Sequence, residues 1–260
     1  MLNRERIGDT NYPLDNFGTY SGKTLNELGV AYPGPRSGRT DAHLEYIRQD
    51  ISAFERMLYS LDYDHQTRGY KSAIDVDSFV DYYILNEFAM NVDGGNLSTY
   101  VYKDIRSHYI MGPVWDFNNS FDNYEYYSLP YDDFYLISHS WYVSLLRDEQ
   151  FVSQIISRYA QLRQGILSED RLMSLIDETT AFLGPALQRN EERWGYSYDD
   201  HLLDDLDIDL QPLNYDRNPK DHADAIHQLK EIIQVRGQFL DEYIHVLQQF
   251  CAESKVKEWN

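Results

Sequence analysis

Two aspartates, Asp93 and Asp116, stand out because their surroundings could support phosphoryl-transfer chemistry. Asp93 lies in a polar loop beside two glycines, and Asp116 follows 23 positions later, directly before Phe117. A phosphoryl-transfer site needs one carboxylate to orient or deprotonate the attacking hydroxyl and another to hold the divalent ion on the phosphates. The residues between the two aspartates alternate as a β-hairpin does, and a hairpin would bring both carboxylates together. The stretch from 75 to 123 therefore predicts a site for a metal and a phosphate.

An analogy with protein kinases supports this interpretation. In those enzymes a catalytic-loop Asp is followed by a short hairpin and then by a metal-binding Asp in the sequence D-F-G. Asp116 and Phe117 repeat the first two letters, whereas Asn118 replaces the glycine. Nearby amides would add neutral oxygen donors of the kind that a hard cation accepts; they are Asn91, Asn96, Asn118 and Asn119.

Each of these residues also has an ordinary structural interpretation. An Asp before two glycines is a common turn pattern, so spacing alone favours a turn role for Asp93 over a chemical one. Asp116 could cap a helix, and we expect the preceding Trp115 to lie in the core. The eight histidines are scattered without the spacing of a zinc site. Two acids beside a cleft would also suit a glycoside hydrolase, so the chemistry stays open at this point.

Composition limits the classes of partner. The 260 residues carry a formal net charge of -20, with 42% apolar and 25% charged residues, as expected for a folded chain. Nucleic acids and anionic membranes are disfavoured because binding to them depends on Lys and Arg. No run of about 18 apolar residues predicts a membrane span, and no signal peptide is visible. The acidity fits a basic protein partner or a cation, although a solubilising surface is the simpler explanation.

The spacing of apolar residues and the positions of turn-forming residues predict an α+β protein that is mainly helical. Residues 1–40 are rich in Gly, Pro and Asn, which indicates loops and short strands. Apolar residues recur at helical spacing in several later stretches, so helices are expected over 41–61, 75–90, 141–146, 149–163, 168–193 and 222–249. The hairpin strands are expected within 97–104 and 109–117. The acidic stretch at about 195–221 is expected to be a solvent-exposed loop.

The two helices before the hairpin have recognisable start signals and apolar faces. Thr40 or Asp41 would cap the first helix, and Asp75 or Asp77 would cap the second. The first helix should pack through residues spaced by three or four positions: Leu44, Ile47, Ile51, Phe54 and Leu58. The second should pack through Phe79, Tyr82, Tyr83, Leu85, Asn86 and Met90. These faces would hold the loop of Asp93 against a core.

The stretch that carries both aspartates resembles a known family. The run DVDSFVDYYILNEFAMNVDGGNLSTYVYKD, followed by MGPVWDFNNSFDN, is similar to the core signature of the CotH family, the spore coat protein H kinases. Segments further along extend the resemblance, which covers roughly residues 31 to 247; they are WYVSLLRDEQFVSQIISRYAQLRQGILSEDRLMSLIDE, RNEERW and LKEIIQVRGQFLDEYI. The resemblance implies an atypical protein-kinase-like fold that uses ATP with Mg²⁺ or Mn²⁺ to phosphorylate Ser or Thr of protein substrates.

The resemblance also implies roles for individual residues. By position in the motif, Asp93 is similar to the catalytic-loop Asp of the family and Asp116 to its metal-binding Asp. Asn118 agrees with the variants of the signature that carry Asn, and is a candidate second metal ligand. The nucleotide-binding residues stay unassigned, with Asn96 as one candidate. Family resemblance would place the protein in a spore coat, at a cell surface or outside the cell, and leaves its compartment undetermined.

Comparison with the family pattern also predicts what this chain lacks. The β-rich N-terminal lobe of the family, with a basic motif that helps to bind ATP, is not found before residue 31. We therefore expect residues 1–40 to be an irregular remnant of that lobe, residues 41–250 a single C-terminal catalytic lobe, and residues 251–260 a tail. Lys71 and Lys103 are interpreted as surface residues and are not assigned to ATP.

These departures from the family pattern bear on activity. Without the lobe that binds the nucleotide, the chain is expected to be a fragment of a longer kinase. Its catalytic turnover by itself is expected to be weak or absent. The alternative is a non-catalytic interaction or scaffold module of a spore-surface or extracellular assembly. Such a module would use its acidic, tyrosine-rich face, since aromatic side chains are good interface anchors.

Overall fold

A small antiparallel sheet connects the start of the chain to the predicted hairpin. The computed structural model describes residues 1–6, 12–20, 26–124, 128–194, 198 and 219–252. Four strands pair in the order β2-β1-β3-β4, with bounds β1 Leu2–Arg6, β2 Asn26–Val30, β3 Thr99–Tyr102 and β4 Ile110–Met111. Leu2 pairs with Val30 on one side and with Val101 on the other. The sheet therefore joins β1 and β2 to the hairpin by hydrogen bonds.

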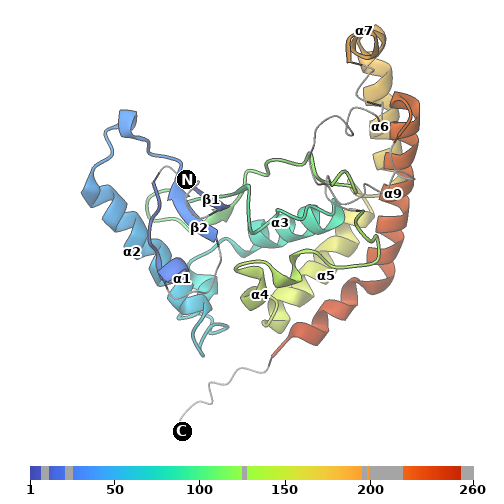
Figure 1. Ribbon diagram of the computed structural model, residues 1–260. Helices are drawn as coiled ribbons and strands as arrows, with labels where there is room; N and C mark the ends of the chain where they lie inside the picture. Colours follow the sequence, from blue (N-terminus) through green and yellow to red (C-terminus); the bar gives the residue numbers. More distant parts are fainter. Residues whose placement is uncertain (7–11, 21–25, 125–127, 195–197, 199–218, 253–260) are drawn as a thin grey trace.

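The first long helix covers this sheet. Helix α2, Asp41–Leu58, begins at Thr40, whose side chain accepts a hydrogen bond from the backbone N–H of His43. This is the capping role that the sequence predicted for Thr40 or Asp41. The short helix α1, Phe17–Tyr20, lies beside α2 in Figure 1. The predicted apolar face of α2 is confirmed for its second half, since Ile51, Phe54 and Leu58 are buried.

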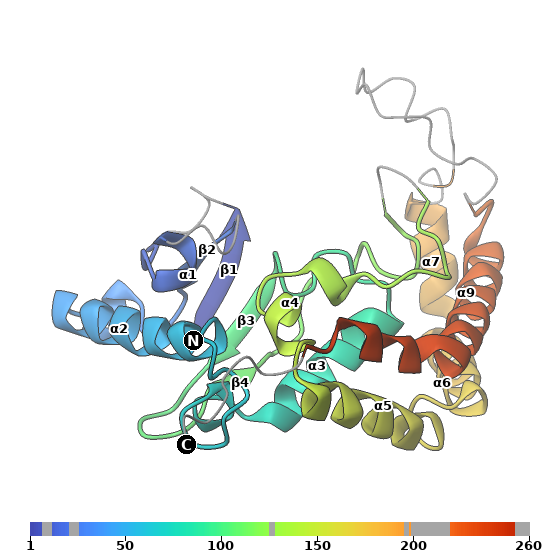
Figure 2. The same ribbon diagram turned by 90° about the horizontal axis from the view of Figure 1, so that it is seen from below.

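Helix α3, Val76–Phe88, leads directly into the loop of Asp93. Its cap is Asp75, whose carboxylate accepts from the backbone N–H of Ser78 at 2.9 Å. Most of the predicted stripe is buried, including Phe79, Tyr83 and Asn86, but the prediction was wrong for Leu85, which is 36% exposed. Helix α5, Glu149–Arg163, packs along α3 and fixes its direction. Both views show the two helices side by side (Figures 1 and 2).

Most of the described residues after Ser140 are helical, with one break that the sequence prediction missed. The elements are α4 Tyr142–Leu145, α6 Glu169–Leu183, α7 Pro185–Trp194 and α9 His222–Tyr243, the last followed by a 3-10 helix over Ile244–Phe250. A single helix over 168–193 was expected. Gly184 takes a φ of 44° and Pro185 has no N–H to donate, so the chain ends one helix and starts another there. The expected acidic loop and the tail lie largely outside the described residues.

The core is continuous from the sheet to the helices. An aromatic cluster joins α2, α3 and the segment before α4: Phe54 lies 5.2 Å from Trp141 between ring centroids, and Phe79 lies 6.3 Å from Trp141. These rings are almost completely buried. None of the described helices is long and apolar enough to cross a membrane. The mainly helical α+β class predicted from the sequence is confirmed.

Candidate active site

The loop that carries Asp93 is a hydrogen-bonded turn at the end of α3. The Asp93 carbonyl accepts from the backbone N–H of Asn96 at 3.0 Å and from that of Leu97 at 2.8 Å. Asn91 anchors the start of the loop, because its Nδ2 donates to Asn86 Oδ1 inside the core at 2.8 Å. The turn geometry predicted for Asp93 is thus confirmed for its backbone, while its side chain is half-buried.

Buried groups on neighbouring elements fix the two glycines of this loop. Gly95 has a φ of 85°, a conformation that side chains disfavour, and its N–H donates to Thr99 Oγ1 at 2.9 Å. Thr99 Oγ1 also lies 3.1 Å from the Tyr82 hydroxyl. At Gly94, an added Cβ would stand only 2.7 Å from Asn86 Oδ1. The loop therefore sits on α3 and β3 with no room for larger residues.

Asp116 lies on an exposed segment that leaves the sheet after β4. The second hairpin strand is much shorter than predicted, because Gly112 has a φ of 115° and Pro113 cannot donate to a sheet ladder. Asp116 itself is exposed, with a φ of 63°. Ser98 Oγ donates to Asp116 Oδ2 at 3.1 Å. The structure thus links Asp116 to the loop that carries Asp93, five residues before Ser98.

The candidate amides occupy turns on either side of this link. Asn118 is exposed, and its Nδ2 donates to Asn119 Oδ1 at 3.0 Å. Its carbonyl accepts from Asn123 Nδ2 at 2.7 Å, which closes the turn after Asp116. Asn96 is half-buried and takes part in the Asp93 turn through its backbone N–H. Asn118 therefore belongs to the Asp116 segment, and Asn96 to the Asp93 loop.

Trp115 corrects one expectation about this region. The sequence placed it in the core, but it is 59% exposed and its ring meets Tyr100 edge to face, with centroids 6.4 Å apart. The reason is the early end of β4, since residues after Met111 no longer alternate into the core. An exposed indole next to Asp116 adds a flat apolar surface to the candidate site.

A buried cation and carboxylate lie behind the site, and the sequence analysis missed both. Arg4 on β1 is fully buried, with its guanidinium carbon 4.6 Å from the centroid of the Trp141 ring. The Glu55 carboxylate on α2 accepts from Asn16 Nδ2 at 2.7 Å, from the Gly18 N–H at 2.6 Å and from Trp141 Nε1 at 3.1 Å. Burial lowers the pKa of Arg4, and the charge of Glu55 opposes that shift.

The location of Arg4 explains why sequence reasoning overlooked it. On β1 it pairs with Thr99 of β3, so strand register places it on the same side of the sheet as the residue that anchors Gly95. The only local signal was the alternation of Leu2 and Arg4, in which one polar residue occupies an inward position. That signal does not reveal a partner on a helix some 50 residues away.

Lys71 and Lys103 are less exposed than the sequence analysis expected. The Lys103 side chain is 21% exposed and its Nζ binds the Asp50 carboxylate of α2 at 2.7 Å. The Lys71 side chain is 18% exposed and binds Asp148 at 2.7 Å. Each lysine is held by a carboxylate from another element, so the prediction that both are surface residues is only partly met.

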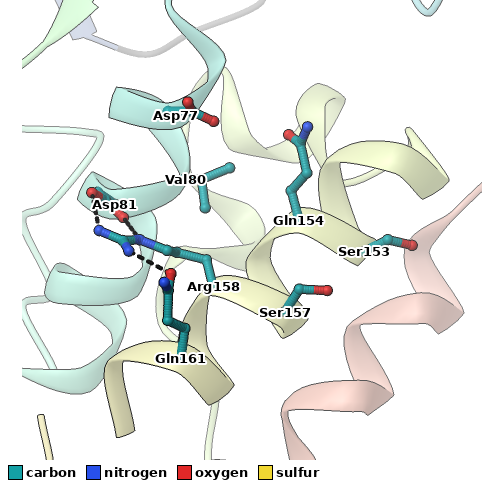
Figure 3. A pocket seen from close by; sticks show the side chains of 8 residues that line it. All are labelled: Asp77, Val80, Asp81, Ser153, Gln154, Ser157, Arg158 and Gln161. Carbon is teal, nitrogen blue, oxygen red and sulfur yellow. Dashed lines mark hydrogen bonds and ion pairs between the residues drawn. The ribbon is translucent and has the colours of Figure 1, made fainter. Parts of the chain in front are cut away.

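A polar hollow on another face is lined by α3 and α5. Its volume is about 760 Å³, and Figure 3 shows Asp77 and Asp81 on α3 facing polar side chains of α5. Arg158 binds both carboxylate oxygens of Asp81, at 2.7 and 3.1 Å, and donates to Gln161 at 2.6 Å. Among the described residues, the predicted site residues are absent from its lining. Because Arg158 occupies the Asp81 carboxylate and the described lining holds none of the predicted site residues, this hollow is not a candidate active site.

The donor set around Asp116 suits a divalent cation that also binds phosphate. Mg²⁺ is usually held by one or two carboxylates together with water and substrate phosphates. The exposed Asp116 carboxylate and the Asn118 amide belong to these donor types. In the part of the chain that the structure describes, no three His, Cys, Asp or Glu side chains converge on one point. A cation here would therefore need oxygen ligands from a nucleotide or water.

Comparison with known proteins identifies the family. The family model described as CotH kinase protein matches residues 14–240, so the chain belongs to the CotH kinase family. A search of curated proteins found no match. The predicted resemblance is confirmed, and the match starts earlier than the expected residue 31. Because of this earlier start, the match also covers the segment around Asn16 and Gly18, in addition to Glu55 and both candidate aspartates.

Proposed function

We propose that this protein is an atypical protein kinase that transfers phosphate from ATP to Ser or Thr of protein substrates. Asp93 orients or deprotonates the acceptor hydroxyl, Asp116 holds Mg²⁺ or Mn²⁺, and Asn118 supports the metal. The observation that carries the proposal is the Ser98–Asp116 hydrogen bond of 3.1 Å, which ties the two aspartate-bearing segments together in a member of a kinase family.

The chain's own residues would act mainly by positioning. ATP with its divalent cation supplies the phosphoryl group and neutralises the charge that develops on it. The rigid Asp93 turn holds a carboxylate at a fixed place, so that it can accept the proton of an incoming hydroxyl. Ser98 holds one oxygen of Asp116, and the other oxygen would be available to a divalent cation. Asn96, in the same turn as Asp93, is a candidate for contact with the nucleotide.

Arg4 and Glu55 have a supporting role in this proposal. In protein kinases an ion pair between a strand Lys and a helix Glu helps to position the phosphates. Arg4 is completely covered and stacked on Trp141, so we assign it to holding β1 and α2 beside the Asp93 loop rather than to touching phosphate. No residue of this chain is assigned to binding the ATP phosphates. We therefore expect phosphoryl transfer by this chain alone to be weak or absent.

Phosphate incorporation from labelled ATP with Mn²⁺ tests this function. The wild-type chain, or a longer protein that contains it, is compared with Asp93→Ala, Asp116→Ala and the control Asp104→Ala. Asp104 is an exposed hairpin carboxylate outside the proposed site. We expect incorporation to be lost in the first two variants and kept in the control. Measurable incorporation that is equal in wild type and Asp116→Ala would rule the assignment out.

A further inference from the structure

A groove runs between the segment after Asp116 and helix α9. Its volume is about 1040 Å³. We call it the α9 groove. One wall comes from the segment after Asp116 together with Tyr131, and the other from Pro219 and one face of α9; the lining residues include Asp122, Asp224, Glu231, Ile232 and Val235. Figure 2 shows α9 beside the chain that follows β4. The groove is large enough for several side chains of an extended peptide.

Buried hydrogen bonds hold the two walls together. Arg236 of α9 is fully buried, and its NH1 donates to the carbonyls of Tyr131 at 2.9 Å and Asp133 at 2.6 Å. Its NH2 binds Glu87 Oε1 at 2.6 Å, and the Glu87 carboxylate accepts the backbone N–H groups of Tyr135 and Leu136. One ion pair therefore fixes α9, the end of α3 and the segment 131–136. The groove is preformed rather than created by binding.

The groove begins at the candidate active site. Phe117 and Asn118 belong to its lining, and they directly follow Asp116. A peptide lying in the groove would run past the proposed metal-binding residue. This continuity distinguishes the α9 groove from the hollow between α3 and α5, whose described lining contains none of these residues.

The charges of the lining favour a basic occupant. Asp122, Asp224 and Glu231 contribute three carboxylates, and no Lys or Arg occurs among the described residues of the lining. Glu231 is exposed, with its carboxylate 3.4 Å from His227 Nε2. Apolar side chains such as Ile232 and Val235 also line the groove. Arginine and lysine fit such a surface, because their stems cover apolar groups while their charged ends reach carboxylates.

We propose that the α9 groove binds an extended, Arg- or Lys-containing segment of the protein substrate and leads its acceptor Ser or Thr toward Asp93. This inference rests on the proposed kinase function for the fate of the peptide, but the binding itself does not need catalysis. Glu231 and Asp224 would then determine specificity, by selecting basic residues on one side of the acceptor.

Peptide binding without nucleotide or metal tests the groove. Fluorescence anisotropy is measured with a labelled Ser peptide flanked by arginines and with the same peptide carrying glutamines instead. Glu231→Lys is compared with Glu242→Lys, an exposed position further along α9 that is outside the described lining. Both changes alter the net charge equally. We expect Glu231→Lys to weaken binding of the arginine peptide about five- to tenfold and Glu242→Lys to leave it unchanged.

Two results would overturn the inference. If both lysine variants weaken binding equally, the effect is overall charge and not the groove. If the glutamine peptide binds as tightly as the arginine peptide, the acids do not select the occupant. A phosphorylation assay separates the two proposals: in an active protein, Glu231→Lys should raise KM for the peptide and leave KM for ATP unchanged. Peptide binding together with measurable phosphorylation that is equal in wild type and Asp116→Ala would remove the proposed kinase site and keep the groove.

Discussion

Replacing Arg236 with Met should destabilise the protein severely, because it breaks a completely buried ion pair. The side chains of Arg236 and Glu87 are 0% and 1% exposed. Removing one partner of a buried pair leaves an uncompensated charge and typically costs about 3–5 kcal/mol. The Tyr131 and Asp133 carbonyls would also lose their donor. We therefore expect the free energy of unfolding to fall by about 3–5 kcal/mol, equivalent to roughly 6–20 °C in Tm.

Urea unfolding followed by circular dichroism measures this loss, and Arg158→Met provides a matched control. Arg158 also binds both oxygens of a carboxylate, that of Asp81, but the two side chains are 38% and 48% exposed. An exposed pair of this kind contributes about 0–1 kcal/mol. The double variant Glu87→Gln with Arg236→Met should lose less than the sum of the single variants. A loss below about 1 kcal/mol for Arg236→Met would refute the stabilising role of the Arg236–Glu87 ion pair.

Further predictions concern acid stability and two of the four tryptophans. Partial burial pushes the pKa of Asp241 upward, but hydrogen bonds from Arg163 and Tyr159 outweigh it and hold the pKa below its ordinary value. That stabilisation is present above a pH of about 4 and is lost as pH falls through the folded-state pKa, so Asp241→Asn should flatten the acid side of a stability–pH curve; an unchanged curve would contradict this. Trp115→Ala should change the free energy of unfolding by less than about 1 kcal/mol, whereas the buried Trp141→Ala should cost about 3–5 kcal/mol. Equal losses in urea unfolding would contradict the exposed position of Trp115.

The helices were predictable because their signals are local. Thr40 and Asp75 cap helices where the sequence placed them, and the spacing of Ile51 and Phe54 identified a buried face. The break before Pro185 was also present in the sequence as a Gly-Pro pair, and the strong periodicity on both sides hid it. Local signals thus determined the type of each helix better than its ends.

The sheet and the surroundings of the two buried arginines were beyond such reasoning. Strand β1 finds its partners β2 and β3 through tertiary pairing, and β3 lies nearly a hundred positions away. Arg236 forms an ion pair with Glu87 in the core, and the charge of Glu55 favours the charged form of the buried Arg4. Periodicity cannot predict which distant carboxylate approaches a buried arginine. Trp115 was misplaced for a related reason, since its exposure depends on where β4 ends.

The candidate site was predictable in part. The sequence identified the Asp93 turn and the Asp116 segment, and family resemblance gave them chemical roles that remain predictions. The link through Ser98 and the groove beside Asn118 emerged only from the three-dimensional arrangement. Both depend on the path of the chain after Met111, which leaves the sheet earlier than its β-propensity suggested.

Calorimetric titration of the chain with Mn²⁺ in the presence of ATP tests the central claim most directly, because it does not require turnover. We expect the wild type and Asp104→Ala to bind with similar affinity and Asp116→Ala to show at least a tenfold loss, corresponding to about 1.4 kcal/mol. Titration with Mn²⁺ alone shows how much of the affinity depends on phosphate oxygens. Equal binding by all three proteins, or no binding by any of them, would contradict a metal and nucleotide site at Asp116.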